Sequence, residues 1–440
     1  MILAHGVGTR TDLPLPVWLA ALGAGMALMI SFVVLAVLWR RPRLRGDAGW
    51  PLPRSLTRMA DAAATRILLQ GLTLAAVVGV CVVGFAGPQV SDDNLAPWAF
   101  FVTFWVGLVP ASLVFGPVWR VLNPLRLVHA GFAAVLRIDL EHGLRPLPSW
   151  LGYWPAAASL AAFSWFELVW YPDRMDPPAV AIFITSYAVV HTGGALVFGR
   201  RWFAFGDGFE VYSTLLGSLA PLARRACDRA LVLRNPLHGM ETVPGGPGLV
   251  GVVVALVGAT AYDGLSRTSW WETNVSYSLV NVTLGLFWTM LLIGLVFLLG
   301  TWSLVGPKPN PGALALGVPN AGVFAHILVP IAAGYAMAHY FSLLIFDGQL
   351  TLILASDPFG SGADLLGTAA RNIDYTVLST SAIAAVQVMA IVLGHLVAAV
   401  GAHDRAVRLL PSGSAVRTQY PLLAVMVVLT MGAVGLAFAG

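Results

Sequence analysis

Three histidines lie within long apolar stretches of this chain: His191, His326 and His395. Each lies about seven residues from the end of its apolar stretch, at the end that is next to a basic loop. At 1.5 Å per residue, each histidine is therefore about 10 Å inside the membrane boundary on that side. Neutral imidazole is the commonest metal ligand in proteins and enters hydrocarbon at a lower cost than a permanent charge. Three such ligands with an open fourth position predict a zinc-type or copper-type site, with a divalent transition metal as cofactor. Tyr187, one turn before His191, is placed to support that ligand from outside the metal shell.

Two other interpretations of these histidines remain open. Equal depth does not make three helices face one another, so each imidazole could instead bridge to the backbone or a hydroxyl of a neighbouring helix. The same residues could also be axial ligands of a haem, in a membrane subunit that handles haem or quinone.

A second group of ionisable residues lies near the opposite boundary. Glu167, Asp263 and His339 each fall within about two helical turns of it, and Tyr335 and Tyr340 accompany His339. An ionisable side chain in hydrocarbon costs about 2.5 to 3.5 kcal/mol on insertion scales, so those retained there are candidates for function. Two carboxylates and a histidine could bind a divalent cation, relay a proton, or act as general base and acid on a water. We therefore predict Glu167, Asp263 and His339 as catalytic residues.

The competing interpretation of this second group is structural. Asp263 would end its helix in solvent, and Glu167 would pair with it or with Arg267. The segment 319–346 borders both levels, and its Pro330 and Gly334 predict a kink that a cavity or a neighbouring helix would have to accommodate.

Membrane-spanning elements must position these residues. Of the 440 residues, 58% are hydrophobic and 10% are charged, whereas a soluble domain carries about 25% charged residues. A spanning helix needs roughly 20 apolar residues, so the pattern predicts one all-α polytopic membrane domain of about 10 transmembrane helices. It excludes a soluble enzyme and also an outer-membrane barrel, whose strands alternate in polarity. The predicted spans are 16–39, 67–86, 96–117, 151–171, 178–198, 247–265, 276–302, 319–346, 376–401 and 418–439.

The basic residues orient these spans. All of the 25 Lys and Arg residues except Arg10, Arg174, Arg267 and Arg371 fall in alternate connections. Because positive charge stays in the cytoplasm, both termini are predicted to be external, in a bacterial inner membrane. The arginines accompany apolar segments, so the lipid bilayer is the expected partner and nucleic acid is not.

The connections carry predictions of their own. Loops 40–66, 118–150 and 199–246 are expected in the cytoplasm with amphipathic surface segments, one of them a helix over 214–233. The connection 347–375 is expected to be an external loop, either a mobile lid or a plain connector. The group His403-Asp404-Arg405 is expected to be a solvated cap at the end of span 376–401.

Several stretches resemble a group of bacterial multi-span membrane proteins named fenitrothion hydrolase. They are AHGVGTRTDLPLP at 4–16, WRRP at 39–42, VWR and NP within 118–124, AHYFS at 338–342, and GH followed by AHDRA within 394–406. The resemblance runs over most of the chain and implies membrane-bound hydrolysis of an organophosphate ester. It supplies no active-site residues beyond those argued above.

Two classes of function follow. The first is a membrane-bound, metal-dependent hydrolase of a phosphoester-type substrate, in which the metal provides a water of low pKa and polarises the phosphoryl oxygen. The second is a transporter or ion-coupled carrier, in which two polar levels and a kinked helix mark a permeation path; the haem or quinone subunit is a further alternative.

Overall fold

The computed structural model describes residues 16–170, 175–243, 245–302, 304, 320–410 and 415–437. Most of the motif at 4–16 therefore lies outside the described residues. Within them the chain is a bundle of helices with a very small sheet, so the predicted all-α class is confirmed. The long helices are α1 (Val17–Leu38), α3 (Ala63–Ala86), α9 (Pro177–Phe198), α12 (Leu249–Ser266), α14 (Leu279–Trp302), α16 (Leu328–Ser356), α17 (Thr380–Leu409) and α18 (Tyr420–Ala437).

Nine helical stretches in the described part of the chain are long and apolar enough to cross a membrane. One of them joins α4 (Leu95–Pro97), the π-helix η2 (Trp98–Val106) and α5 (Leu108–Phe115). The predicted span 151–171 is instead α8 (Trp154–Leu168), which has 15 residues. At 1.5 Å per residue α8 is about 23 Å long, less than the roughly 30 Å of a hydrocarbon core.

The outer ends of the first and last described helices lie close together. Ala21 and Ala24, near the start of α1, share one buried cluster with Val434 and Ala437 at the end of α18. The first and last described helices therefore begin and end on the same side, as the prediction of two external termini requires.

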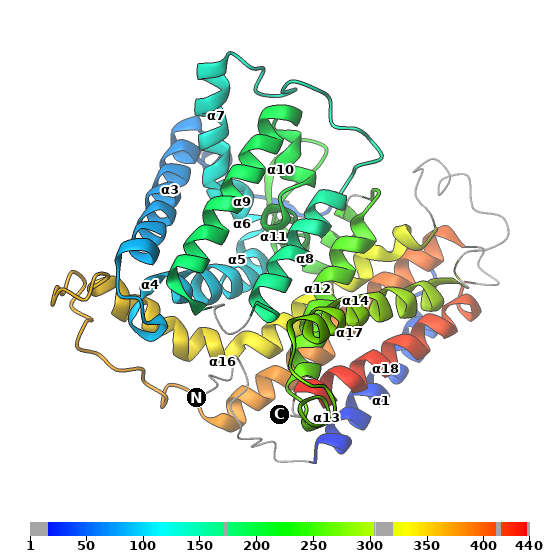
Figure 1. Ribbon diagram of the computed structural model, residues 1–440. Helices are drawn as coiled ribbons and strands as arrows, with labels where there is room; N and C mark the ends of the chain where they lie inside the picture. The colour runs from blue at the N-terminus through cyan, green and yellow to red at the C-terminus, as the bar shows by residue number, and fades with distance from the viewer. Residues whose placement is uncertain are drawn as a thin grey trace.

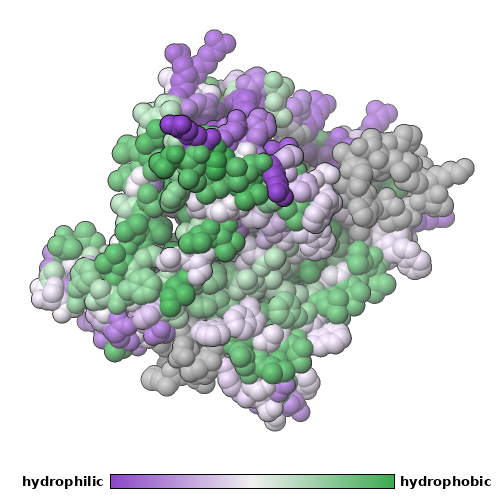
Figure 2. All heavy atoms as spheres, turned by 45° about the horizontal axis from the view of Figure 1, so that its top comes forward, coloured by the Kyte–Doolittle hydropathy of each residue, from purple (hydrophilic) through white to green (hydrophobic). Residues whose placement is uncertain are grey.

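Two groups of helices meet along a seam. In Figure 1, α3, α7 (Pro124–Leu136), α8, α9, α10 (Arg201–Phe205) and α11 (Gly208–Gly217) gather at the upper left, and α1, α14, α17 and α18 at the lower right. Helices α12 and α16 belong to the seam, since α12 contacts both α8 and α14, and α16 contacts both η2 and α17. Large apolar side chains remain exposed on α1, α3 and α14, and Figure 2 shows a broad hydrophobic surface below a hydrophilic end. Such a surface suits a lipid bilayer.

Glycines set the closest helix contact of the seam. A Cβ atom added to Gly334 of α16 would lie 2.4 Å from the carbonyl oxygen of Ala390 and 3.1 Å from Cα of Gly394, both in α17. Small residues at facing positions let two helix backbones approach each other in a membrane. Gly334 and Gly394 therefore fix the distance between α16 and α17.

The region 199–246 differs from its prediction. Residues 214–233 are not an amphipathic helix: α11 ends at Gly217, and an antiparallel hairpin of β2 (Leu222–Arg224) and β3 (Leu231–Leu233) follows. The turn is closed by the pair between Arg225 and Asp228, whose charged atoms lie 2.6 Å apart, and Arg229 adopts a positive φ of 59°. These local side-chain bonds compete with helix formation. Strand β1 (Trp50–Pro51) joins β3 to complete the sheet in the order β1-β3-β2.

Helix α11 is also no surface segment. Nine of its residues are buried, including Glu210 and Tyr212, and it packs against α5, α8 and α16. A short helix of this kind enters the bundle and is tolerated there because protein, rather than lipid, surrounds it.

Two further boundaries shift. Helix α16 continues to Ser356, so the external connection 347–375 begins about three helical turns later than predicted. Helix α17 continues to Leu409 and contains His403 and Asp404, which are 1% and 0% exposed, so the predicted solvated cap is wrong. Trp39 Nε1 donates to Asp404 Oδ1 at 2.8 Å, and the backbone N–H of Arg43 donates to the same oxygen at 2.6 Å. These hydrogen bonds hold the end of α1 against α17.

Substituting the seam glycine should destabilise the protein. Gly334→Ala adds a Cβ where a backbone oxygen lies 2.4 Å away, and overpacking of this kind costs typically about 1 to 3 kcal/mol. The matched control is Gly348→Ala on the same helix, where the nearest atom would lie 3.8 Å away. Thermal unfolding in detergent should show a lower midpoint for Gly334→Ala alone, and equal midpoints would contradict this account of the seam.

Cys227 reports on which side of the membrane the hairpin lies. Its side chain is exposed between β2 and β3, whereas Cys81 lies half-buried in the apolar helix α3. A membrane-impermeant maleimide should label the protein only after cells are permeabilised, and the label should disappear in Cys227→Ser. Labelling of Cys227 in intact cells would reverse the predicted orientation.

Candidate functional site

Asp263 and His339 form a buried pair across the seam. Nε2 of His339 in α16 donates to Oδ2 of Asp263 in α12 at 2.5 Å, and Nη2 of Arg267 donates to Oδ1 at 2.7 Å. The hydroxyl of Tyr340 lies 3.4 Å from Oδ2, at the long end of a hydrogen bond. The two predicted residues Asp263 and His339 therefore meet, and Asp263 is not the solvated helix end of the competing interpretation.

Local sequence explains how these groups are held. Asp263 and Arg267 are four residues apart at the end of α12 and so lie on one face. Tyr335 precedes His339 by one turn and stacks on it, with ring centroids 5.8 Å apart and planes 13° apart. Gly264 admits the Tyr335 hydroxyl, which lies 2.7 Å from where a Cβ would stand. Packing thus fixes the imidazole at its hydrogen-bonding position.

Glu167 of α8 and Asp263 line the same cavity. An outer cavity is lined by Glu167, Asp263, Arg267 and Tyr340, together with Phe101, Val102, Leu168, Met175 and Leu343. An inner cavity shares Glu167, Leu168 and Tyr340 with it and continues along α11 and α12. Both have room for water-sized particles only. The third predicted residue therefore lines both cavities, whereas His339 lines neither of them.

A π-helix forms one wall of both cavities. Residues Trp98–Val106 follow i to i+5 hydrogen bonding, as in the bond from the N–H of Gly107 to the carbonyl of Val102 at 3.2 Å. Phe101 and Val102 face the outer cavity, and Trp105 and Val106 the inner one. Such wide turns occur frequently at functional sites because they redirect side chains.

The charge of Asp263 is compensated within the described part of the site. Asp263 and His339 are 4% and 2% exposed, and Arg267 is a permanent cation that contacts Asp263. Burying net charge in an apolar environment is costly, so the carboxylate is held between a cation and an imidazole.

The three inner histidines do not gather into one site. Nδ1 of His191 accepts from Trp202 Nε1 at 3.2 Å, and its Nε2 lies 3.2 Å from Ser159 Oγ, so both ring nitrogens are engaged. Nδ1 of His326 donates to the carbonyl of Val323 at 3.1 Å, and Nδ1 of His395 donates to Ile391 at 2.9 Å. Within the described ranges no three His, Cys, Asp or Glu side chains are grouped to hold a metal ion.

The bridging interpretation therefore fits His191, which links α9 to α8 and α10. His326 and His395 each bond a carbonyl of their own turn instead. The structure gives no support to a metal shared by the three histidines. Their equal depth did not determine which way each side chain faces.

Sequence analysis missed a buried polar cluster at the start of α11. Nδ2 of Asn123 donates to Asp207 Oδ2 at 2.8 Å and lies 3.1 Å from Glu210 Oε2. Arg126 forms a short salt bridge with Glu210, and the Tyr187 hydroxyl donates to Asp207 Oδ1 at 2.6 Å. Burial raises the pKa of Asp207, against the opposing effect of its hydrogen bonds. The available signal was an Asp three residues before a Glu, the pattern of a helix capping box.

Comparisons of the chain with family models, curated proteins and solved structures find no match. The fold and the site thus define a class: an all-helical, multi-pass membrane protein with a buried carboxylate–histidine pair beside two small cavities.

Asp263→Asn should destabilise this site strongly. It leaves Arg267 and His339 without their carboxylate, and removing one partner of a buried ion pair costs about 3 to 5 kcal/mol. The control is Asp61→Asn, because Asp61 forms exposed pairs with Arg66 and Arg224, and exposed pairs contribute about 0 to 1 kcal/mol. Thermal unfolding in detergent measures both; a small, equal effect would mean that the buried pair is not ionised.

Proposed function

We propose that this protein is an ion-coupled carrier that moves protons across the membrane, with Glu167, Asp263 and His339 as its proton-binding groups. The observation that carries the proposal is that Glu167 lines both cavities at the seam of two helix groups, beside the buried Asp263–His339 pair. Asp, Glu and His side chains that face the interior of a membrane helix bundle are typical of proton relays.

The position of the carboxylates supports a proton as the bound ion. Asp263 is held by Arg267, whereas Glu167 lines both cavities. A proton that enters from the outer cavity can reside on Glu167. Loading and unloading therefore change the charge held between α12 and α16, and a change of charge at an interface is able to bias two helix arrangements.

The position of His339 favours a carrier over hydrolysis of a phosphoester. A general base must reach the reacting water within about 3 Å, and His339 lines neither cavity. Hydrolysis, which the resemblance implies, is retained as an outcome of the experiment below.

Proton movement can be measured with the purified protein in liposomes that contain a pH-sensitive dye. After a pH step in the presence of valinomycin and potassium, wild-type vesicles should equilibrate faster than protein-free vesicles. Glu167→Gln should fall towards the protein-free rate, because the amide cannot take up and release a proton. The matched control is Glu241→Gln, since Glu241 is also shielded but pairs with Arg405 and Arg408 at 3.3 and 3.6 Å, away from the cavities.

Two outcomes would overturn the proposal. One is a wild-type rate equal to that of protein-free vesicles. The other is a Glu167→Gln rate equal to wild type. Cleavage of a chromogenic phosphotriester by wild type, lost in Glu167→Gln while proton movement is absent, would instead assign the site to hydrolysis.

A further inference from the structure

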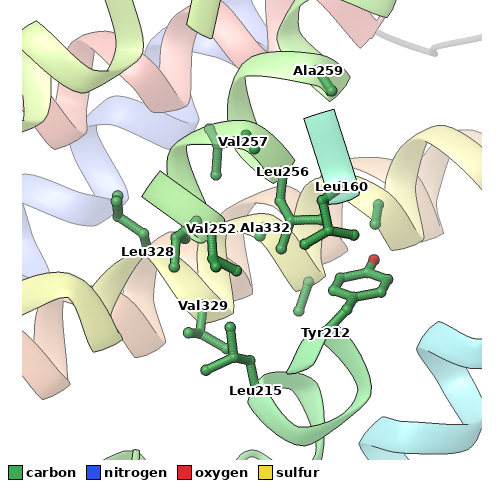
Figure 3. Close-up of a cluster of buried hydrophobic side chains, with 14 of the residues drawn as sticks. Leu160, Tyr212, Leu215, Val252, Leu256, Val257, Ala259, Leu328, Val329 and Ala332 are labelled. Atoms are coloured by element: carbon green, nitrogen blue, oxygen red, sulfur yellow. The ribbon is translucent and has the colours of Figure 1, made fainter. Parts of the chain in front are cut away.

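The inner cavity extends the site from Glu167 towards α11. It is lined by residues of six elements, namely η2, α5, α8, α11, α12 and α16. Its polar lining consists of Trp105, Ser164, Glu167, Tyr212, Thr260 and Tyr340. Figure 3 shows Tyr212 rising from α11 beside Leu256 and Ala332, which belong to the apolar part of the same lining. Polar groups from separate elements thus converge on one small space.

Trp105 contributes an unsatisfied donor to this cavity. The residue is 6% exposed, and its Nε1–H has no hydrogen-bond partner among the described residues. Its ring packs against Phe163 and Tyr212, with centroids 4.4 and 4.9 Å apart, so the indole cannot turn away to find one. A buried donor without an acceptor is destabilising, and a partner that fits the cavity removes that cost.

Trp98 provides a comparison within the same π-helix. It is 4% exposed, and its Nε1 donates to the carbonyl of Ser91 at 2.9 Å. Within this π-helix, the unsatisfied donor thus belongs to the tryptophan that lines the cavity.

We propose that the inner cavity is a water-binding site that carries protons between Glu167 and the inner end of the bundle, which deepens the proposed function and rests on it. A bound water accepts a hydrogen bond from Trp105 Nε1–H and donates to the Glu167 carboxylate, with the hydroxyls of Ser164 and Tyr212 completing its two to four partners. When Glu167 is protonated, it passes its proton to the water. The water passes another proton inward, so that each step moves one proton along a hydrogen bond and conserves charge.

Helix α11 gives this path a direction. Tyr212 lines the cavity, and the next residue, Ser213, bonds Ser112 at 2.9 Å. The N-terminal end of the same helix holds the buried Asp207 and Glu210, which share Asn123 as a donor. Arg126 forms a salt bridge with Glu210 there, and Asp207 is the carboxylate of this end that would accept a proton from the path.

The water is detectable without any transport. Short X-ray pulses convert bound water into hydroxyl radicals, which oxidise the side chains next to it. In the purified full-length protein, Trp105 should be oxidised severalfold more than the similarly buried control Trp98, whose Nε1 is already bonded and which lines neither cavity. Oxidation of Trp105 no greater than that of Trp98 would overturn the water site, whether or not the protein moves protons.

The role of the water in conduction is tested by Trp105→Phe, which keeps an aromatic ring and removes the one N–H. Proton flux in liposomes should fall severalfold, while Trp98→Phe should conduct as wild type if the protein remains folded by thermal unfolding. Wild-type flux in Trp105→Phe, with flux still lost in Glu167→Gln, would overturn the inner path and leave the outer site standing. Absence of flux in wild type would overturn the proposed function, and with it the path, while the radical labelling would still decide the water site.

Discussion

Charge inside an apolar bundle has to be neutralised, and the pair of Asp263 with His339 is where this chain meets that requirement across its seam. The carboxylate is shared between Arg267 of its own helix and His339 of the opposite helix. Neither α12 nor α16 can rotate without leaving a buried charge unpaired, which costs several kcal/mol. The pair therefore sets the rotation of α12 and α16 about their axes. The glycine contact sets the distance between α16 and α17.

The buried acids of the protein differ in their surroundings. At the end predicted to be cytoplasmic, Asp404 and Glu241 face Arg405 and Arg408, so two acids meet two permanent cations. Asp404 also accepts from Trp39 and from two backbone N–H groups. Such a cluster is stable as a tie between helices. Glu167 instead lines two cavities at the seam.

The Asp404 cluster is thus suited to anchoring helices, whereas the polar seam contains space. The cavities at Glu167 lie between helices of both groups, and their walls include a π-helix and the short helix α11.

Much of the architecture was predictable because it depends on local quantities. Composition and run length are sufficient to place apolar helices, since roughly 20 residues are needed to cross a bilayer. Errors arose where side chains close local structure, as Arg225 and Asp228 do in the hairpin, or where a predicted surface segment such as α11 is enclosed by other helices. The shortness of α8 followed from where its flanking turns fall, which hydropathy does not register.

The sequence by itself determined the depth of the ionisable residues, because depth is counted in residues from a boundary at 1.5 Å each. Only the tertiary structure decided which of them face one another, because that depends on the rotation and packing of each helix. Asp263 and His339 share a depth and meet. His191, His326 and His395 also share a depth, yet His191 bonds Ser159 and Trp202, and the other two bond their own backbone. Equal depth is a property of one helix at a time, whereas a site is a property of helices packed together.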